Sequence, residues 1–308
     1  MILDPEPPVR PTPCDWRHLY PFDPHYLTTG QGRMHYLDEC PSGSDDSGEV
    51  LLMVHGNPTW SFHWRELIKA WRGRLRVVAP DHLGCGLSDR PLGPPVRLAD
   101  HIDNLRQLIE ALDLRRVTLV AHDWGGAIGL GAALAAANRF ARFVLLNTGA
   151  FPPRHIPARI RLARTPLFGR LAVQGLNLFL RAAFRMALVD RRVLTREVRA
   201  GYLAPYNSWR QRQGIYHFVK DIPRSPRQPT YATLAGIEAR LPQLARQPVL
   251  LVWGMQDWCF TPACLERLLE LLPQAAVHRI EQAGHWVVED ARHAVIARVE
   301  QFLAAHPL

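Results

Sequence analysis

Asp123 is the residue of this sequence whose surroundings say most about chemistry. An apolar, β-branched run at residues 117–121 leads into it, and a run rich in alanine and glycine at 127–137 follows. This order predicts a strand, a tight turn and a helix, and such a turn lifts one side chain above the edge of a parallel sheet. A carboxylate placed there can displace a leaving group from an alkyl carbon and form an ester with it. The structural alternative is an aspartate that only caps the helix.

Two later residues, Asp257 and His285, could complete a catalytic set with Asp123. Asp257 follows a buried-type strand at residues 250–253 and a glycine turn, which would place it at the carboxyl edge of the sheet. His285 comes after a second short strand at 277–280 and directly follows a glycine. A histidine held in one tautomer by a carboxylate can activate water or shuttle a proton. A surface histidine is the structural alternative for His285.

Asn57 and Trp124 are the expected hydrogen-bond donors for a leaving group. Asn57 lies in the loop after an apolar strand at residues 50–54, and Trp124 directly follows the proposed nucleophile. Both places commonly supply backbone N–H groups to an oxyanion hole. The side chains add an amide and an indole N–H, which suit a departing halide or a developing carboxylate. Alternatively, Asn57 only forms a turn with Pro58, and Trp124 only fills the core.

The elements that would position these residues alternate along the chain. Alternating strands and helices predict an α/β protein with a mostly parallel, eight-stranded sheet and helices on both faces. We expect residues 1–31 to form an extended arm and residues 291–305 to form the last helix. Strands are predicted at residues 32–37, 50–54, 76–79, 117–121, 143–147, 250–253 and 277–280, and helices at 59–71 and 99–112.

The alternation stops after two prolines at residues 152–153. Only helical patterns follow, such as the one at 167–188, and this predicts a helical cap inserted after the sixth strand. Residues 1–151 and 231–308 would form the core, and residues 152–230 the cap. The apolar stripe of 167–189 would cover a pocket suited to long alkyl chains, or would meet lipid or a partner protein. Pocket-lining aromatics are predicted at Trp209, Phe218 and Trp258, with ordinary core packing as the alternative.

Positive charge is concentrated in the predicted cap. Residues 151–230 hold 16 lysines and arginines against three acids, so the net charge of this segment is +13. The whole chain has a net charge of +9, so the remaining residues together carry −4. A solvated surface is one explanation, and an acidic protein partner or an anionic membrane is another. Nucleic acid is not expected as a partner, because no recognition motif accompanies the charge.

Composition fits one globular domain with a cap insertion, since the chain has 308 residues, of which 47% are hydrophobic and 21% charged. Residues 1–13 lack the basic flank and apolar run of a signal peptide, and no apolar stretch of about 18 residues or more suggests a membrane span. No metal ion or cofactor is expected. We expect a cytoplasmic protein with free thiols, because the number of cysteines is odd. They are Cys14, Cys40, Cys85, Cys259 and Cys264.

From about residue 32 onward, the sequence resembles the haloalkane dehalogenase group of the α/β-hydrolase fold. The resemblance implies that Asp123 is the nucleophile, that Asn57 and Trp124 bind a leaving halide, and that Asp257 and His285 complete the triad. Some members carry their acid after the preceding strand, but residues 145–149 offer none here. The motifs are His55-Gly56-Asn57-Pro58-Thr59-Trp60, Pro80-Asp81-His82-Leu83-Gly84-Cys85-Gly86, the turn at Asp123, Trp253-Gly254 to Asp257, and Ala283-Gly284-His285.

Several details resemble more closely the β-lactone decarboxylases of bacterial long-chain olefin biosynthesis. That resemblance implies an enzyme that converts a cis-β-lactone with two long alkyl arms to a cis-alkene and carbon dioxide. It also implies a complex with acyl-condensing, reducing and lactone-forming enzymes. The residues are Asp81-His82-Leu83-Gly84-Cys85-Gly86, His122-Asp123-Trp124-Gly125-Gly126-Ala127, residues 253–262 and Ala204-Pro205-Tyr206-Asn207-Ser208-Trp209.

Three other functions stay open from sequence, and a fourth, a serine esterase, has little support. Haloalkane dehalogenase is the main alternative. An epoxide hydrolase would use the same nucleophile with two cap tyrosines, and Asn57 argues against it. A non-catalytic binding module would not need a complete triad, and a serine esterase would need a serine at position 123. The cap tyrosines are Tyr202, Tyr206, Tyr216 and Tyr231.

Overall fold

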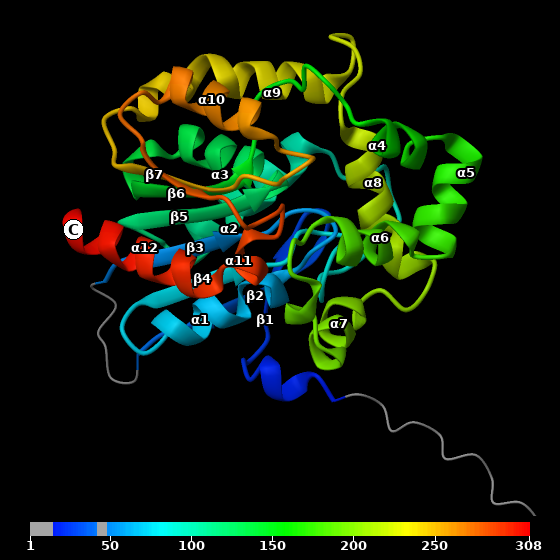
Figure 1. The fold of residues 1–308 in the computed structure, drawn as a ribbon, viewed down its shortest axis with the longest axis horizontal. Helices are drawn as coiled ribbons and strands as arrows, with labels where there is room; N and C mark the ends of the chain where they lie inside the picture. The colour runs from blue at the N-terminus through cyan, green and yellow to red at the C-terminus, as the bar shows by residue number, and fades with distance from the viewer. Residues whose placement is uncertain (1–14, 42–47) are drawn as a thin grey trace, which may run out of the picture.

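The computed structural model describes residues 15–41 and 48–308. In these residues eight strands form one sheet in the order β1-β2-β4-β3-β5-β6-β7-β8 (Figure 1). β2 runs antiparallel to β1 and β4, and every other neighbouring pair is parallel, which confirms the predicted mostly parallel sheet. The strands are β1 (His25–Thr29), β2 (Gly32–Glu39), β3 (Val50–Val54), β4 (Arg76–Pro80), β5 (Val117–Asp123), β6 (Phe140–Thr148), β7 (Val249–Gly254) and β8 (Ala276–Ile280).

Helices cover both faces of this sheet (Figure 1). One face packs against α2, α3, α9 and α10, and the other against α1, α11 and α12. These helices are α1 (Arg65–Trp71), α2 (Leu98–Ala111), α3 (Trp124–Ala135), α9 (Pro229–Arg240), α10 (Pro262–Leu271), α11 (Val287–Asp290) and α12 (Arg292–Ala305). Short 3₁₀ turns lie at η1 (Arg17–Leu19), η2 (Ser61–Trp64), η3 (Ala137–Arg139), η5 (Arg191–Val193), η6 (Arg210–Arg212) and η7 (Leu241–Leu244).

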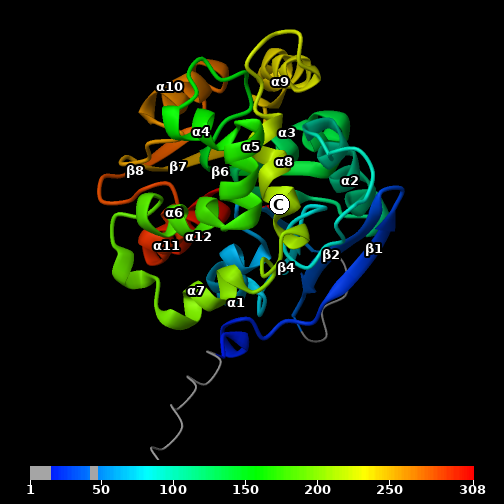
Figure 2. The ribbon, with the colours of Figure 1, turned by 90° about the vertical axis from the view of Figure 1, so that its right-hand side faces the viewer.

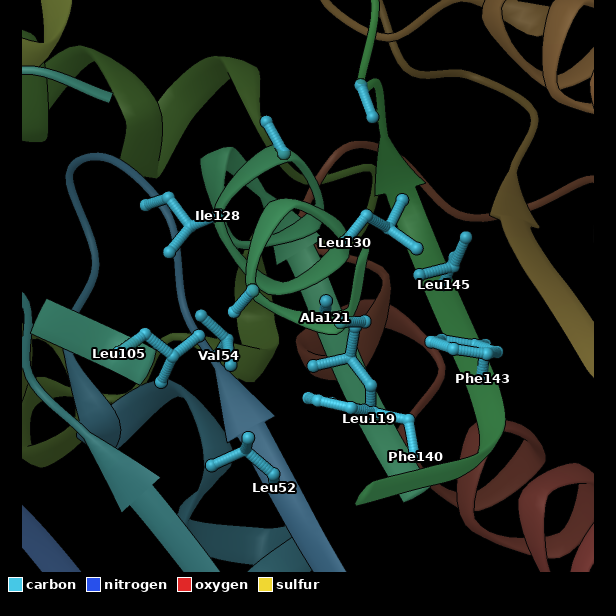
Figure 3. Packing of buried hydrophobic residues seen from close by; sticks show 14 of the residues in the cluster. Leu52, Val54, Leu105, Leu119, Ala121, Ile128, Leu130, Phe140, Phe143 and Leu145 are labelled. Carbon is cyan, nitrogen blue, oxygen red and sulfur yellow. The ribbon is translucent and has the colours of Figure 1, made fainter. Parts of the chain in front are cut away.

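The central strands are apolar at nearly every position because both of their faces are buried. Along each strand, successive side chains point to opposite faces. Figure 3 shows one of these faces, where alternate residues of three strands pack against two helices. They are Leu52 and Val54 of β3, Leu119 and Ala121 of β5, and Phe143 and Leu145 of β6, with Leu105 of α2 and Ile128 and Leu130 of α3.

The cap is formed by the chain segment that follows β6 and precedes α9. It lies at one side of the sheet (Figures 1 and 2). It contains α4 (Ala158–Ala163), α5 (Pro166–Arg170), a π-helix η4 (Leu171–Gly175), α6 (Leu178–Met186), α7 (Arg196–Leu203) and α8 (Gln213–Asp221). The helix predicted at residues 167–188 is therefore interrupted. The break falls at Asn177, whose φ of 54° is left-handed, a conformation that asparagine tolerates better than most residues. The predicted cap boundary at residue 230 falls just inside α9.

The N-terminal prediction was only partly correct. Instead of an extended arm up to residue 31, the described part contains η1 and the edge strand β1, which pairs with β2. The predictions for Cys14 and for a missing signal peptide at residues 1–13 lie outside the described residues. Cys40, Cys85, Cys259 and Cys264 are free thiols. Within residues 15–41 and 48–308 no helix has the length and apolar character needed to cross a bilayer.

A buried ion pair ties η2 and α1 to the C-terminal helices. Arg65 and Glu289, whose side chains are 1% and 3% exposed, form two hydrogen bonds of 2.5 and 2.9 Å. Glu289→Gln would leave the Arg65 charge buried without its partner, so we expect a loss of about 3–5 kcal/mol in the free energy of unfolding. Urea unfolding would measure it. Glu66→Gln, which removes a more exposed carboxylate beside the same arginine, should cost less than about 1 kcal/mol. Equal losses would contradict the argument.

Candidate active site

Asp123 lies at a strained corner between β5 and α3. Its φ of 54° and ψ of −129° are unusual for a residue with a side chain, and such strain persists where the surrounding structure enforces it. Two glycines make the corner feasible. A Cβ on Gly125 would collide with the carbonyl of Val54, and a Cβ on Gly56 would collide with the Asp123 carboxylate itself. The Thr148 hydroxyl donates a hydrogen bond to the backbone carbonyl of Asp123. The corner thus presents the carboxylate at the carboxyl edge of the sheet.

The structure brings Asp123, His285 and Asp257 together, as the sequence predicted. His285 Nδ1 donates a hydrogen bond of 2.8 Å to Asp257 Oδ2, and its Nε2 lies 3.6 Å from Asp123 Oδ2. All three residues are buried. Because Asp257 holds the Nδ1 proton, Nε2 of a neutral imidazole faces Asp123 as a base. The alternative of a surface histidine does not fit this geometry.

The pKa values of the pair Asp123 and His285 are both shifted upward. Burial raises the pKa of Asp123, although His285 and the backbone N–H groups of Trp124 and Asn57 favour its charged form. For His285 burial acts in the opposite direction, but the carboxylates of Asp257 and Asp123 outweigh it and raise its pKa. A buried carboxylate that has little solvation is a better nucleophile than one in water, and the site can hold a proton on His285.

Asp257→Asn tests the origin of the His285 shift. Without that carboxylate, burial is opposed only by Asp123, so the pKa of His285 should fall from above its ordinary value of about 6.5 to below it. The stabilisation that protonated His285 gives the fold is present below about pH 6.5 and is lost as pH rises through the raised pKa, so the variant should lose it. NMR titration of the His285 ring would measure the change. The exposed Asp103→Asn is the control, and an unchanged titration in Asp257→Asn would refute the assignment.

Asn147 belongs to this site, and sequence reasoning missed it. Its side-chain amide donates hydrogen bonds to Asp257 Oδ2 at 3.0 Å and to the Gly254 carbonyl at 3.1 Å. Its Oδ1 accepts from the Gly254 N–H at 2.8 Å. Asn147, at the end of β6, therefore fixes Asp257 in the loop that follows the neighbouring strand β7. The one signal in the sequence is that Asn147 is a polar residue at the end of an apolar strand, in a segment that offers no acidic residue.

His122 positions His285 from the other side. Its Nε2 donates a hydrogen bond of 2.8 Å to the backbone carbonyl of His285, and the two rings lie 4.6 Å apart. Burial, together with the neighbouring His285, holds the pKa of His122 well below its ordinary value. His122 is thus a neutral donor that orients the loop of the base. His122 is a positioning residue, because in the described chain its ring forms no hydrogen bond with the Asp123 carboxylate.

The two backbone N–H groups predicted for an oxyanion hole bond the Asp123 carboxylate itself. The Asn57 backbone N–H donates to Asp123 Oδ1 at 2.6 Å, and the Trp124 backbone N–H also favours the charged carboxylate. Oδ2 is left to face the substrate. The Asn57 side-chain amide uses one N–H on the Ile215 carbonyl at 3.2 Å, so its second N–H remains for a ligand. The Trp124 indole N–H makes no hydrogen bond to the described part of the protein.

Asp123 opens into an apolar cavity between core and cap. Its volume is about 510 Å³, which is in the range of ordinary ligand pockets. Asn57, Trp124 and His285 line it around the carboxylate. The rest of the lining extends from α9 and α10 on one side to α6 on the other and is mostly apolar, with Phe151, Ile160, Phe168, Phe179, Met186 and Leu234 among its members. No group of three metal-ligating side chains occurs in the described residues.

The aromatic predictions had mixed outcomes. Trp258 lines the cavity and donates a hydrogen bond from its indole to the Met186 carbonyl at 2.7 Å. Trp209 does not line it: the residue is 42% exposed, and its ring lies under the Arg170 guanidinium. Phe218 also lies outside the lining, because it stacks on His101 and packs behind Trp124.

The tyrosines that an epoxide hydrolase would use do not face this cavity. The Tyr202 hydroxyl bonds to His63 and Glu289, and the Tyr206 hydroxyl accepts from the Gly86 N–H and donates to the Thr59 carbonyl. Among the described residues, no tyrosine of the cap lines the cavity. The geometry therefore favours a leaving group received by Asn57 and Trp124.

Comparison with known proteins gives the family that the sequence motifs resemble. Residues 49–291 match the family described as alpha/beta hydrolase fold. A protein of Shewanella oneidensis named cis-3-alkyl-4-alkyloxetan-2-one decarboxylase is 38% identical over 92% of this chain and 89% of its own length. A protein of the same name from Xanthomonas campestris pv. campestris is 36% identical over 94% of this chain and 98% of its own.

Haloalkane dehalogenases are also similar. Haloalkane dehalogenase 2 of Mycobacterium bovis is 33% identical over 91% of this chain and 95% of its own length. The solved structure of a haloalkane dehalogenase from Paraglaciecola agarilytica NO2 superposes with a TM-score of 0.78 at 26% identity, and the match covers 94% of this chain and 95% of that one. This chain therefore belongs to the α/β-hydrolase fold family of enzymes, in the group that contains these decarboxylases and the haloalkane dehalogenases.

Proposed function

We propose that this enzyme converts a cis-β-lactone with two long alkyl substituents to a cis-alkene and carbon dioxide. The observation that carries the proposal is the Asp123 carboxylate, which is buried and directs Oδ2 into an apolar cavity of about 510 Å³. The names of the relatives at 38% and 36% identity support it, since an oxetan-2-one is a four-membered lactone. Neighbouring alkyl groups on that ring would extend along the cavity toward α9 and α10 on one side and α6 on the other.

The geometry favours attack on the ring carbon that bears oxygen over attack on the carbonyl. Attack on the carbonyl would require N–H donors for the oxyanion of the substrate. The backbone N–H groups that would form such a hole already bond the Asp123 carboxylate, that of Asn57 at Oδ1. Displacement at the alkyl carbon instead releases a carboxylate, which the Trp124 indole and the second N–H of the Asn57 amide can receive.

The reaction then balances without water. A bond forms between Asp123 Oδ2 and the alkyl carbon as the ring C–O bond breaks, and its electron pair stays on the freed carboxylate. In the second step the bond to that carboxylate breaks, carbon dioxide leaves, and the electron pair forms the double bond and expels Asp123 unchanged. Inversion in the first step followed by anti elimination in the second gives the cis-alkene from a cis-lactone.

Product analysis tests this proposal. Purified protein and the Asp123→Asn variant would each be incubated with a synthetic long-chain cis-β-lactone, and the products followed by proton NMR. We expect a cis-alkene with the unmodified protein only. Recovery of unchanged lactone, or of β-hydroxy acid alone, would sink the decarboxylase proposal.

Haloalkane hydrolysis is the second candidate, and one distance favours it. His285 Nε2 lies 3.6 Å from Asp123 Oδ2, where it could activate water against an ester at Asp123. The backbone N–H groups of Asn57 and Trp124 that bond the carboxylate would then stabilise the oxyanion formed from that ester. Halide release from bromoalkanes, without alkene formation from the lactone, would support this candidate.

Two further points stay proposals. A complex with acyl-condensing, reducing and lactone-forming enzymes would explain how an insoluble substrate is passed on, and co-purification at low salt would test it. A cytoplasmic location rests on composition and on the odd number of cysteines, and cell fractionation would test that.

A further inference from the structure

One surface of the cap exposes an unusual number of large apolar side chains. Eleven such residues are exposed in the described chain, and six of them fall between residues 162 and 178. The most exposed is Leu167, at 88%. We call these six residues the cap patch: Leu162, Leu167, Phe168, Leu171, Leu176 and Leu178. Exposed apolar residues that cluster in this way mark interaction sites more often than isolated exposed leucines do.

Helical spacing places the centre of the patch on one face. Leu167 and Leu171 are four residues apart, and Phe168 lies three before Leu171, in the continuous run of α5 and η4. Leu162 comes from the neighbouring α4. Figure 2 shows α4, α5 and α6 on the side of the cap that faces the viewer. The patch thus belongs to an outer surface of the cap, on the side away from the sheet.

Arginines without an acidic partner accompany the cap patch in the sequence. Residues 151–189 contain no aspartate or glutamate, and six of their arginines are exposed. None of the six forms an ion pair with a carboxylate of the described residues, and their hydrogen bonds go to neutral groups, such as the Gln174 amide oxygen and the Met186 sulfur. They are Arg154, Arg159, Arg161, Arg170, Arg181 and Arg185. Their counter-charge must come from outside the cap.

The cap patch also forms part of the wall of the cavity. Leu162, Phe168 and Leu178 are exposed, and each lines the cavity that contains Asp123. An alkyl chain that entered the cavity past these residues would avoid water only if the patch itself faced an apolar phase. A bilayer is such a phase, whereas a protein bound to the patch would cover this entrance.

We propose that the cap patch and its arginines dock on an anionic phospholipid surface, with the leucines in the acyl boundary and the guanidinium groups among the phosphates. Basic, amphipathic helices that carry leucine and phenylalanine bind membranes in this way. This docking proposal does not depend on which reaction Asp123 performs, because docking uses residues outside the catalytic set. For a long-chain substrate, the rim of the cavity would then face the layer in which that substrate dissolves.

Vesicle flotation with the purified full chain tests the surface without any substrate. We expect the bound fraction to be about tenfold higher on vesicles of phosphatidylcholine with phosphatidylglycerol than on phosphatidylcholine alone, and to fall as salt rises. The double variant Leu167→Glu, Leu171→Glu should lose about tenfold or more of that binding, because it places charge where leucine side chains would be buried. Leu92→Glu is the matched control, since Leu92 is an 85% exposed leucine of the core, and its binding should not change.

A second pair of variants tests the charge. Arg170→Gln with Arg181→Gln should remove most of the preference for anionic vesicles, whereas Arg246→Gln, at an exposed arginine of the core, should not. Unchanged thermal unfolding would show that the variants are folded, as expected for exposed positions. The proposal is overturned if the purified chain does not bind anionic vesicles, if it binds neutral ones equally, or if the leucine variant binds as the control does. Failure of alkene formation would leave all of these results untouched.

Discussion

Asp123→Asn is expected to lower turnover by roughly 10⁴- to 10⁶-fold, whichever substrate is used. An amide oxygen is a far weaker nucleophile than a carboxylate oxygen. Asp123 is the cavity-lining carboxylate that lies between the Asn57 N–H and the His285 ring. The rate of alkene formation from a cis-β-lactone, and of halide release from a bromoalkane, would measure the loss. Mass spectrometry should show no covalent adduct on the variant.

The same variant should keep or gain stability. Because burial raises the pKa of Asp123 above its unfolded value, the fold favours the protonated form, and the ionised carboxylate costs stability once pH lies above that raised pKa. The neutral asparagine removes the cost at neutral pH, and the gain should vanish at low pH, where the carboxyl is protonated in both states. Thermal unfolding as a function of pH would measure this. A biological role that survives Asp123→Asn unchanged would revive the view that the chain is a binding module, whereas retained turnover would show that Asp123 is not the nucleophile.

The candidate catalytic residues could be located from sequence because each lies at or just after the end of its own strand. Asp123 ends an apolar strand just before a pair of glycines, and Asp257 and His285 each follow a short strand and a glycine. The carboxyl ends of parallel strands meet at one edge of the sheet. Local sequence was therefore enough to gather them. Asn147 escaped because its role depends on β6 lying beside β7, where the Gly254 N–H and Asp257 come within its reach.

The errors in the fold have equally specific causes. β1 is an edge strand with mostly exposed side chains, so residues 25–29 carry no apolar alternation that could have marked it. In the cap, a single helix was predicted over residues 167–188 because the apolar stripe is continuous. Gly175 and Asn177, which both disfavour helix, indicate the interruption that the structure shows. Trp209 and Phe218 were assigned to the pocket by residue type alone, whereas their positions depend on contacts with Arg170 and His101 that are distant in sequence.

His285→Gln should separate the two candidate reactions. Hydrolysis of an ester at Asp123 needs a base for water, so with a bromoalkane the variant should complete the first displacement and then stop. We expect steady-state turnover to fall by roughly 10⁴-fold or more and the alkyl adduct on Asp123 to accumulate, as a mass increase of the intact protein. In the unmodified protein the hydrolytic rate should rise with pH through the raised pKa of His285, because only the neutral imidazole accepts a proton.

Alkene formation from the lactone should respond differently to the same change. In that route carbon dioxide leaves and the electron pair expels Asp123, so neither water nor a base is consumed, and His285 contributes only its charge and its position beside Oδ2. We therefore expect His285→Gln to lower the alkene rate by about tenfold or less, with no lasting adduct. His122→Gln, which loosens only the loop of the base, is the control for misplacement and should affect both reactions alike. If alkene formation fell as steeply as hydrolysis, the elimination would depend on His285 as an acid or base, and the water-free route through a displaced carboxylate would be wrong.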